Sequence, residues 1–335
     1  MMNQGLTFED VTLVPQYNNV PSRTIPSLET WITSKTKVKI PLIPSNMDTV
    51  INDELADIII KNGGIPIFHR FTSFEQQIKW SEKYNKNCFL SCGLANIDGI
   101  VKLLEAGARG VCIDIAHGHS ESMLSFIREL KRRMPDKEII AGNVCTATAF
   151  HDLVNAGADA IKVGVGGGSA CTTRIVTGFG VPQFTAIKEC GKIAEKLRIP
   201  MIADGGIKNS RDVVLALAAG ASTVMIGGLF SKTYESAAKK EIIDGDMYSI
   251  FRGQASNEFQ VDFYGGMKKG TVAEGIQFKS KCISSCQDLI ENLCGGLRSG
   301  LTYGGAKSIK ELQRKAEFMS VTSNFMNESR PRPEK

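Results

Sequence analysis

Eight short apolar runs recur along this sequence, and they constrain its fold more than any other feature. Most positions across the runs are Ile, Val, Leu, Ala, Phe or Gly, without the strict alternation of apolar and polar residues that a half-exposed strand shows. Continuous apolar runs are typical of parallel strands whose two faces are both covered. The runs occupy residues 40–46, 64–70, 88–94, 110–116, 138–144, 160–166, 200–206 and 223–228.

Helix-like patterns separate these runs. In NIDGIVKLLEAGA and SRDVVLALAAGA, for example, apolar residues recur every three or four positions, as on the buried face of a helix. Three of the patterns end in AGA or AAGA, which places a glycine where the helix stops. Eight strand–helix units predict an α/β fold, a (β/α)8 TIM barrel instead of an open doubly wound sheet.

The barrel pattern ends well before the chain does. We place the barrel core at about residues 38–230 and interpret residues 231–322 as a polar, glycine-rich flap with a helical appendage, folded over one end of the barrel. No linker rich in proline and serine separates the two parts. The sequence therefore predicts a single catalytic domain over residues 1–335.

The composition restricts the classes of function. A formal net charge of +5 over 335 residues, with basic and acidic residues interspersed, gives no reason to expect a nucleic-acid partner. No run reaches the ~18 apolar residues needed to cross a bilayer, and the first residues do not resemble a signal peptide. The 9 cysteines lack zinc-binding spacing and favour reduced thiols. We therefore expect a cytoplasmic protein with no membrane partner and no zinc site.

Glycines follow the last two runs, as ADGG at residues 203–206 and IGG at residues 226–228. In a barrel of this type the active site lies at the carboxyl ends of the strands, and phosphate is often bound after the last two. Glycine lets backbone N–H groups approach a phosphate, and Asp204 is placed to accept from a sugar hydroxyl. The alternative for either motif alone is a tight turn with a helix-capping aspartate; the two together favour phosphate binding.

Residues 166–174 read GGGSACTTR and follow the sixth run, on the predicted catalytic face. A cysteine there can attack an electrophilic carbon once it is a thiolate, a state that Arg174 or the N–H groups of the loop would favour. No histidine lies nearby in sequence as its base, and the HxH pair at His117 and His119 is as often structural as functional. The alternative is a flexible surface loop that happens to hold a thiol.

These motifs, together with TFEDVTLVP near the start and TGFGVPQ after the cysteine, resemble the IMP dehydrogenase / GMP reductase family. The resemblance extends from Leu6 to about Val321. It implies a (β/α)8 barrel, usually a homotetramer, in which the loop cysteine attacks C2 of a purine nucleotide and forms a covalent thioimidate. Cys171 would then be the nucleophile.

Several features resemble the GMP reductase branch. The segment after the second run lacks the CBS domains that many dehydrogenases insert there, and the flap QASNEFQVDFYGGMKKGTVAEG lacks the Arg-Tyr pair with which dehydrogenases activate water. FRG and SNMDTV agree, whereas GLRSG and YGGAKSIKELQRKAEF are more like a bacterial dehydrogenase. The resemblance thus implies NADPH-dependent reductive deamination of GMP to IMP and ammonia. The alternatives are an IMP dehydrogenase without CBS domains, a non-catalytic purine-nucleotide-binding barrel and a flavin-binding barrel.

The resemblance also assigns roles to individual positions. It makes Thr173 and Glu274 the pair that moves protons to and from the departing ammonia. For the nucleotide it implies contacts at Ser169, Asp204, Gly205, Gly206, Gly227, Gly228, Gly253, Gln254, Ala255 and Gly275. For NADPH it implies contacts at Ser22, Arg23, Arg70, Asp114, Ile115, Ala116, Ser299, Gly300, Leu301 and Thr302. For a monovalent cation, usually potassium, it implies a site at Gly166, Gly168, Cys171 and Arg174.

Three of the departures from the family pattern bear on the proposed site, and a further one is TYGGA in place of TYVGA at residues 302–306. Gly167 stands where a proline is usual, Gln254 where a methionine is usual, and Thr271 where GMP reductases often carry an arginine. These substitutions bear on the cation loop, on the choice of base and on the choice of dinucleotide.

Overall fold

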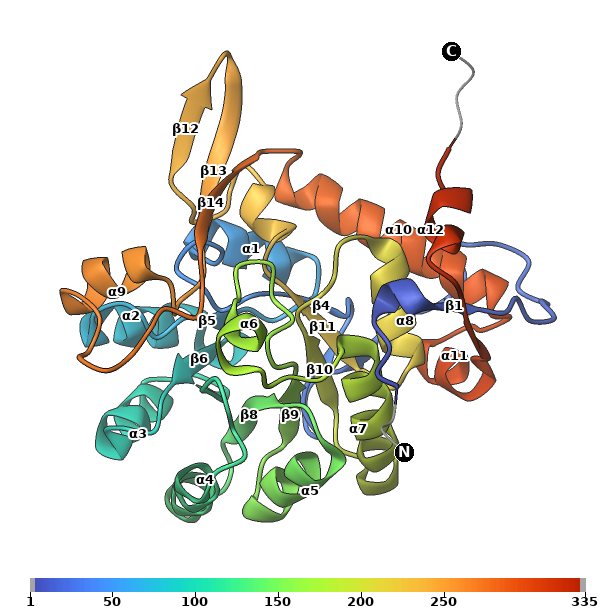
Figure 1. Ribbon diagram of the computed structural model, residues 1–335. Helices are drawn as coiled ribbons and strands as arrows, with labels where there is room; N and C mark the ends of the chain where they lie inside the picture. Colours follow the sequence, from blue (N-terminus) through green and yellow to red (C-terminus); the bar gives the residue numbers. More distant parts are fainter. Residues whose placement is uncertain (1–3, 332–335) are drawn as a thin grey trace.

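Eight parallel strands form one curled sheet in the computed structural model, which describes residues 4–331 (Figure 1). The strands follow the order β4-β11-β10-β9-β8-β7-β6-β5, so the barrel is nearly closed. Every predicted strand run contains one of them, which confirms the (β/α)8 barrel. The strands are β4 (Leu42–Pro44), β5 (Ile67–Phe68), β6 (Phe89–Cys92), β7 (Gly110–Asp114), β8 (Glu138–Val144), β9 (Ala160–Val163), β10 (Met201–Asp204) and β11 (Thr223–Ile226).

Helices surround the sheet (Figure 1). Gly107, Gly157 and Gly220, at the predicted helix stops, have φ between +114° and +134°, as expected of glycines that end helices. The eighth position of the ring is filled by α10, which packs against both α8 and α1 and comes from the segment beyond residue 230. The ring consists of α1 (Asp53–Lys61), α2 (Phe74–Tyr84), α3 (Ile97–Glu105), α4 (Glu121–Arg133), α5 (Ala147–Ala156), α7 (Gln183–Leu197), α8 (Ser210–Ala218) and α10 (Cys286–Tyr303).

Further elements lie outside this ring. The β1–β15 pair joins the N-terminal segment to the C-terminal segment, and β2 and β3 pair with each other. The β12–β13 hairpin with β14 projects from the body (Figure 1). No helix of the described residues is long and apolar enough to cross a membrane. These elements are β1 (Val11–Leu13), β2 (Thr30–Trp31), β3 (Lys37–Val38), α6 (Thr173–Thr177), β12 (Lys240–Ile243), β13 (Asp246–Arg252), α9 (Asn257–Tyr264), β14 (Gln277–Lys281), α11 (Ile309–Lys315), β15 (Phe318–Ser320) and α12 (Asn324–Glu328).

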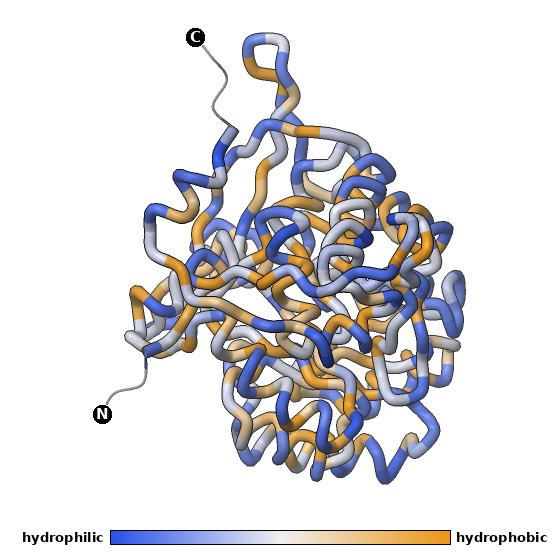
Figure 2. Tube along the Cα trace, turned by 90° about the vertical axis from the view of Figure 1, so that its right-hand side faces the viewer, coloured by the Kyte–Doolittle hydropathy of each residue, from blue (hydrophilic) through white to orange (hydrophobic). Residues whose placement is uncertain are grey.

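The inside of the barrel changes from apolar to polar along every strand. Each strand contributes one residue to a buried apolar cluster inside the barrel. Ile32 and Val38 of the N-terminal hairpin belong to the same cluster. Figure 2 shows apolar segments in the interior. The strand residues of the cluster are Ile43, Ile67, Phe89, Cys112, Ile140, Ala160, Ile202 and Met225. Side chains two positions apart on a strand point to the same face. The next inward residues are therefore Ser45, His69, Ser91, Asp114, Gly142, Lys162, Asp204 and Gly227, all of them polar or glycine.

Gly142 is expected to tolerate no side chain. A Cβ at this position would lie 2.6 Å from Lys162 Cβ and 2.7 Å from the Lys162 carbonyl oxygen. Gly142→Ala should therefore lower the free energy of unfolding by about 1–3 kcal/mol, measured by urea denaturation. Gly295→Ala is the matched control, because no heavy atom lies within 4 Å of a Cβ there and alanine favours the helix. Equal unfolding midpoints for the two variants would contradict this packing.

Candidate functional site

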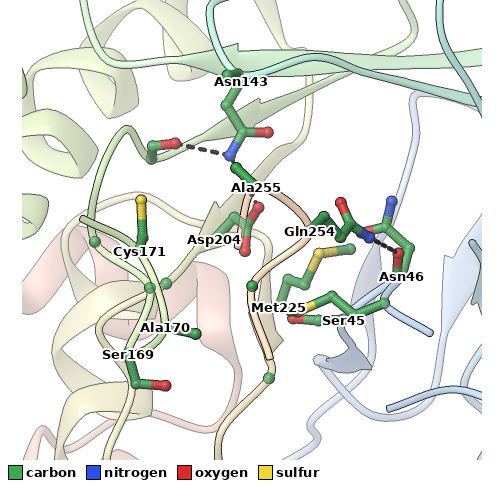
Figure 3. A pocket seen from close by; sticks show the side chains of 18 of the residues that line it. Ser45, Asn46, Asn143, Ser169, Ala170, Cys171, Asp204, Met225, Gln254 and Ala255 are labelled. Carbon is green, nitrogen blue, oxygen red and sulfur yellow. Dashed lines mark hydrogen bonds between the residues drawn. The ribbon is translucent and has the colours of Figure 1, made fainter. Parts of the chain in front are cut away.

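The carboxyl ends of the strands open into a cavity of about 500 Å³ (Figure 3). The loops after six of the eight strands line it, together with Asn143 near the end of β8, and the flap between β13 and β14 covers one side. Every predicted catalytic and nucleotide-binding residue lines this cavity except Gly275, which instead pairs with Cys171 as an isolated bridge. The structure thus brings together the residues that the sequence analysis assigned to one nucleotide site.

Backbone hydrogen bonds hold the cysteine loop against the end of the flap. Ile276 N donates to Ala170 O at 2.9 Å, and Thr172 N donates to Glu274 O at 2.9 Å. The two bonds lie on either side of Cys171, so the position of this residue depends on the flap. The loop after β9 is the longest connection between neighbouring barrel strands, and this pairing gives it a defined shape.

A chain of hydrogen bonds leads from the thiol to a carboxylate. Cys171 Sγ donates to Thr173 Oγ1 at 3.2 Å, and Thr173 Oγ1 donates to Glu274 Oε2 at 2.8 Å. Thr173 and Glu274 are 101 positions apart in sequence. A hydroxyl that both accepts and donates can pass a proton, so this arrangement provides a route from the thiol to the carboxylate.

The histidines do not take part in this route. None of the four lines the cavity among the described residues. His69 is buried, and this burial lowers its pKa to about 4, so its ring is neutral near pH 7. His119 Nε2 lies 2.9 Å from Asp152 Oδ2, and His117 is exposed. The base available to Cys171 is therefore a carboxylate.

Three glycine-containing loops converge at one end of the cavity. Gly205 and Gly206 have φ of +97° and +82°, which favours glycine at both positions. A Cβ on Gly205 would lie 3.1 Å from the carbonyl carbon of Gly167, and a Cβ on Gly228 would lie 3.0 Å from Ser169 Oγ. The glycines let the loops after β9, β10 and β11 approach closely, which places backbone N–H groups and one hydroxyl around a space suited to a phosphate.

The floor of the cavity carries an ion network that the sequence analysis did not single out. Lys162 Nζ lies 2.8 Å from Asp114 Oδ1 and 2.6 Å from Asp204 Oδ2, and the lysine side chain is only 3% exposed. Asn143 Nδ2 donates to Asp204 Oδ2 at 2.9 Å, and Figure 3 labels both residues. On the other side, Asn46 Nδ2 donates to Asp114 Oδ2 at 2.9 Å.

Lys162 and Asp114 are both charged at neutral pH. Burial by itself would lower the pKa of Lys162, but Asp114 and Asp204 outweigh it and raise the pKa above its ordinary value. Burial likewise would raise the pKa of Asp114, but the pairing with Lys162 and the Asn46 hydrogen bond outweigh it and lower the pKa. Two carboxylates therefore share one ammonium group.

The flap is tethered to the barrel at the residue that precedes it, Arg252 at the end of β13. Arg252 Nη2 lies 2.7 Å from Asp48 Oδ2, and its Nη1 donates to Asp262 of α9. Phe71 packs edge-on against Phe259 of the same helix, with ring centroids 4.7 Å apart. The flap helix α9 is thus held against the loop that follows β5.

Two of the three departures from the family pattern lie at the cavity. Gln254 Nε2 donates to Asn46 O at 2.9 Å, which joins the flap to the end of β4 (Figure 3). Gly167 lies in the cysteine loop beside Gly205. Thr271 is exposed in the flap, where its hydroxyl donates to Lys268 O at 2.7 Å.

The predicted dinucleotide contacts divide into two groups. Arg70, Asp114, Ile115 and Ala116 line the cavity, and Arg70 also lines a second cavity of about 400 Å³ that extends to the start of α3. The other predicted positions line neither cavity. Ser22 and Arg23 lie in the N-terminal segment, which contacts the end of α10 where residues 299–302 lie (Figure 1).

The predicted cation loop offers oxygen ligands and also a positive charge. The carbonyls of Gly166 and Cys171 accept no hydrogen bond from the described residues, whereas that of Gly168 accepts one from Cys171 N. Carbonyl oxygens suit a hard monovalent cation. The three carbonyls therefore fit such a cation in part, because one of them already accepts a hydrogen bond. The Arg174 side chain is not an oxygen ligand: its Nε donates to Val165 O at 3.1 Å and its Nη2 to Val181 O at 2.6 Å.

Sequence reasoning missed Lys162, Asn143 and Asn46. A signal for them was present, because each is a polar residue inside or directly after an apolar strand run. Lys162 in AIKVGVG is the clearest case, since an unpaired lysine on a strand buried on both faces would be costly. Its partners could not be named before the strand order was known.

Comparison with known proteins identifies relatives along the whole chain. A family model described as the IMP dehydrogenase / GMP reductase domain matches residues 5–332. An inosine-5'-monophosphate dehydrogenase of Cryptosporidium parvum is 37% identical, over 98% of this chain and 95% of the relative. One of Borreliella burgdorferi is 34% identical, over 98% and 96%. A crystal structure of a GMP reductase variant from Trypanosoma brucei, in complex with guanosine 5'-monophosphate, has a TM-score of 0.92 and 26% identity, over 100% of this chain and 99% of that one.

Proposed function

The chain belongs to the IMP dehydrogenase / GMP reductase family of oxidoreductases, and within it we propose that this protein is a GMP reductase. It would convert GMP to IMP and ammonia with NADPH. The observation that carries this choice is the flap: residues 253–276 bring Glu274 to the cysteine relay and contain no arginine, hence no Arg-Tyr pair to activate water. The second candidate is an IMP dehydrogenase, the name that the sequence relatives carry.

In this proposal, the relay starts the reaction. Cys171 passes its proton through Thr173 to Glu274, and the sulfur adds to C2 of GMP. The 2-amino group takes that proton back through the same route, since an amine nitrogen leaves poorly unless it is protonated. The C2–N bond breaks, ammonia departs, and C2 stays bonded to sulfur.

The same residues complete the turnover. The reduced dinucleotide, when bound, supplies a hydride to C2. The C2–S bond then breaks with its electron pair going to sulfur, which releases IMP. Glu274, having regained a proton from solvent, returns it through Thr173 to the Cys171 thiolate.

The rest of the cavity would hold the nucleotide. The glycine loops and Ser169 are proposed to bind the phosphate, because their N–H groups and hydroxyl converge on one end. Asp204 is proposed to accept from the ribose hydroxyls. Backbone groups of Gly253–Ala255 and Gly275 are proposed to bind the base, beside Cys171.

The residues at the mouth of the cavity fit a nicotinamide dinucleotide. Arg70 Nε is buried without a hydrogen-bond partner among the described residues, so a donor is available to an anionic group there. We propose that Asp114–Ala116 hold the nicotinamide end and that Arg70 contacts phosphate, which favours NADPH. Ser22, Arg23 and residues 299–302 would contribute from a neighbouring subunit of the proposed homotetramer. Potassium would bind the carbonyls of the cysteine loop.

Two parallel assays test the proposed function. The protein is incubated with GMP and NADPH, and separately with IMP and NAD, while the absorbance of the reduced nicotinamide is followed. We expect consumption of NADPH in the first mixture and no change in the second. Formation of NADH in the second mixture alone would show a dehydrogenase, and no change in either would favour a non-catalytic barrel.

A further inference from the structure

We propose that Lys162 is a positioning residue that couples the nucleotide subsite to the dinucleotide subsite. One ammonium group, buried to 3% exposure, pairs with a carboxylate of each: Asp204, proposed to bind the ribose, and Asp114, proposed to bind the dinucleotide. The inference rests on the proposed function, because that function assigns the two carboxylates to different ligands.

The strand register explains how Lys162 reaches both partners. Lys162 on β9 lies in register with Gly142 on β8, and Gly142 lies in register with Asp114 on β7. Because Gly142 has no side chain, the lysine extends across β8 to a carboxylate two strands away. Asp204, the last residue of β10, lies on the opposite side of β9.

The neighbouring groups cannot replace the charge of Lys162. Asn143 donates to Asp204, and Asn46 donates to Asp114 and Ser91, but both are neutral. Without the lysine, two partly buried carboxylates, 17% and 18% exposed, would face each other across the cavity floor without an ammonium group between them. The charge of Arg70 also lowers the pKa of Asp114, but less than Lys162 does. Like charges in such surroundings favour protonation of one of them.

The shared ammonium group also makes the two subsites interdependent. A ribose hydroxyl that donates to Asp204 weakens its hold on Lys162 and strengthens the pairing of Lys162 with Asp114. Occupation of one subsite therefore changes the charge presented to the other, which is a coupling free energy between the two ligands.

The test measures binding instead of turnover. Calorimetric titration with GMP between pH 5 and 8 is carried out on the wild type, Lys162→Met and Lys162→Arg. For Lys162→Met we expect GMP affinity about tenfold lower or more at pH 7, and the pH below which binding weakens should rise by about one unit or more. Lys162→Arg keeps the positive charge and should restore the wild-type pH dependence. A merely structural role would not move the pH dependence.

Asp114→Asn provides a second variant, which removes a charge from the cavity floor and is expected to fold even if Lys162→Met does not. Coupling through Lys162 predicts that this change on the dinucleotide side also weakens GMP binding, by about threefold or more. Unchanged GMP affinity in Asp114→Asn, or an unchanged pH dependence in a folded Lys162→Met, would overturn the inference. If the parallel assays show a dehydrogenase, the same titrations are carried out with IMP. Failure of the proposed reductase activity and failure of the coupling through Lys162 are therefore distinguishable, because the coupling is tested by binding and not by turnover.

Discussion

Cys171→Ala is expected to abolish turnover while leaving GMP bound. The thiol is the only nucleophile on the relay with Thr173 and Glu274, so its removal should lower kcat on the order of 10⁴-fold or more. The proposed phosphate and ribose contacts lie elsewhere in the cavity, so the Kd for GMP should stay within about threefold of the wild type. Steady-state kinetics with GMP and NADPH and calorimetric titration with GMP measure the two quantities.

Cys145→Ala is the matched control for this experiment. Cys145 is also half-buried and follows a barrel strand, but it does not line the cavity. Its replacement should leave kcat unchanged. Loss of GMP binding in Cys171→Ala, or residual turnover close to that of the control, would argue against a covalent role for Cys171.

Glu274→Gln is expected to slow the loss of ammonia much more than hydride transfer. The amide keeps the shape of the side chain but cannot take the proton that Thr173 passes on. General acid–base catalysis contributes about 10²–10⁴-fold, and we expect a loss of that size in GMP deamination. Steady-state consumption of NADPH with GMP measures this loss.

A burst experiment isolates hydride transfer. Mixing enzyme, IMP and NADP without ammonia should form one equivalent of NADPH per active site, because the reverse reaction stops at the covalent nucleotide. The burst rate should fall less than deamination does in Glu274→Gln, because addition to IMP uses Glu274 only to accept the thiol proton, whereas deamination also needs that proton returned to the amino group. Glu258→Gln, exposed in the first turn of the flap helix, is the matched control. An equal loss in both steps would mean that Glu274 has no specific role in releasing ammonia.

Much of the fold was predictable from local patterns. Parallel strands buried on both faces need continuous apolar runs, and all eight runs contain the expected strand. The helix-ending glycines were predictable for an equally local reason, because Gly107, Gly157 and Gly220 adopt backbone angles that other residues avoid. The position of α10, which completes the ring of helices, was not predictable from local patterns. This helix follows the flap, so its place between α8 and α1 depends on contacts between residues distant in sequence.

The candidate site was predictable only in part. Motif spacing marked Cys171 and the glycine loops, and the resemblance added Thr173 and Glu274. Lys162 was missed because a lysine in an apolar run reveals that it needs a partner without revealing which one.

The sequence by itself determined the alternation of strands and helices, the glycines that permit close approach of loops, and the thiol on the catalytic face. Each depends on side-chain periodicity or backbone freedom over a few neighbouring residues. Only the tertiary structure decided that Thr173 donates to a glutamate 101 positions away and that one lysine pairs with aspartates of two other strands. Those contacts depend on strand order, register and the path of the flap, which closure of the whole barrel sets.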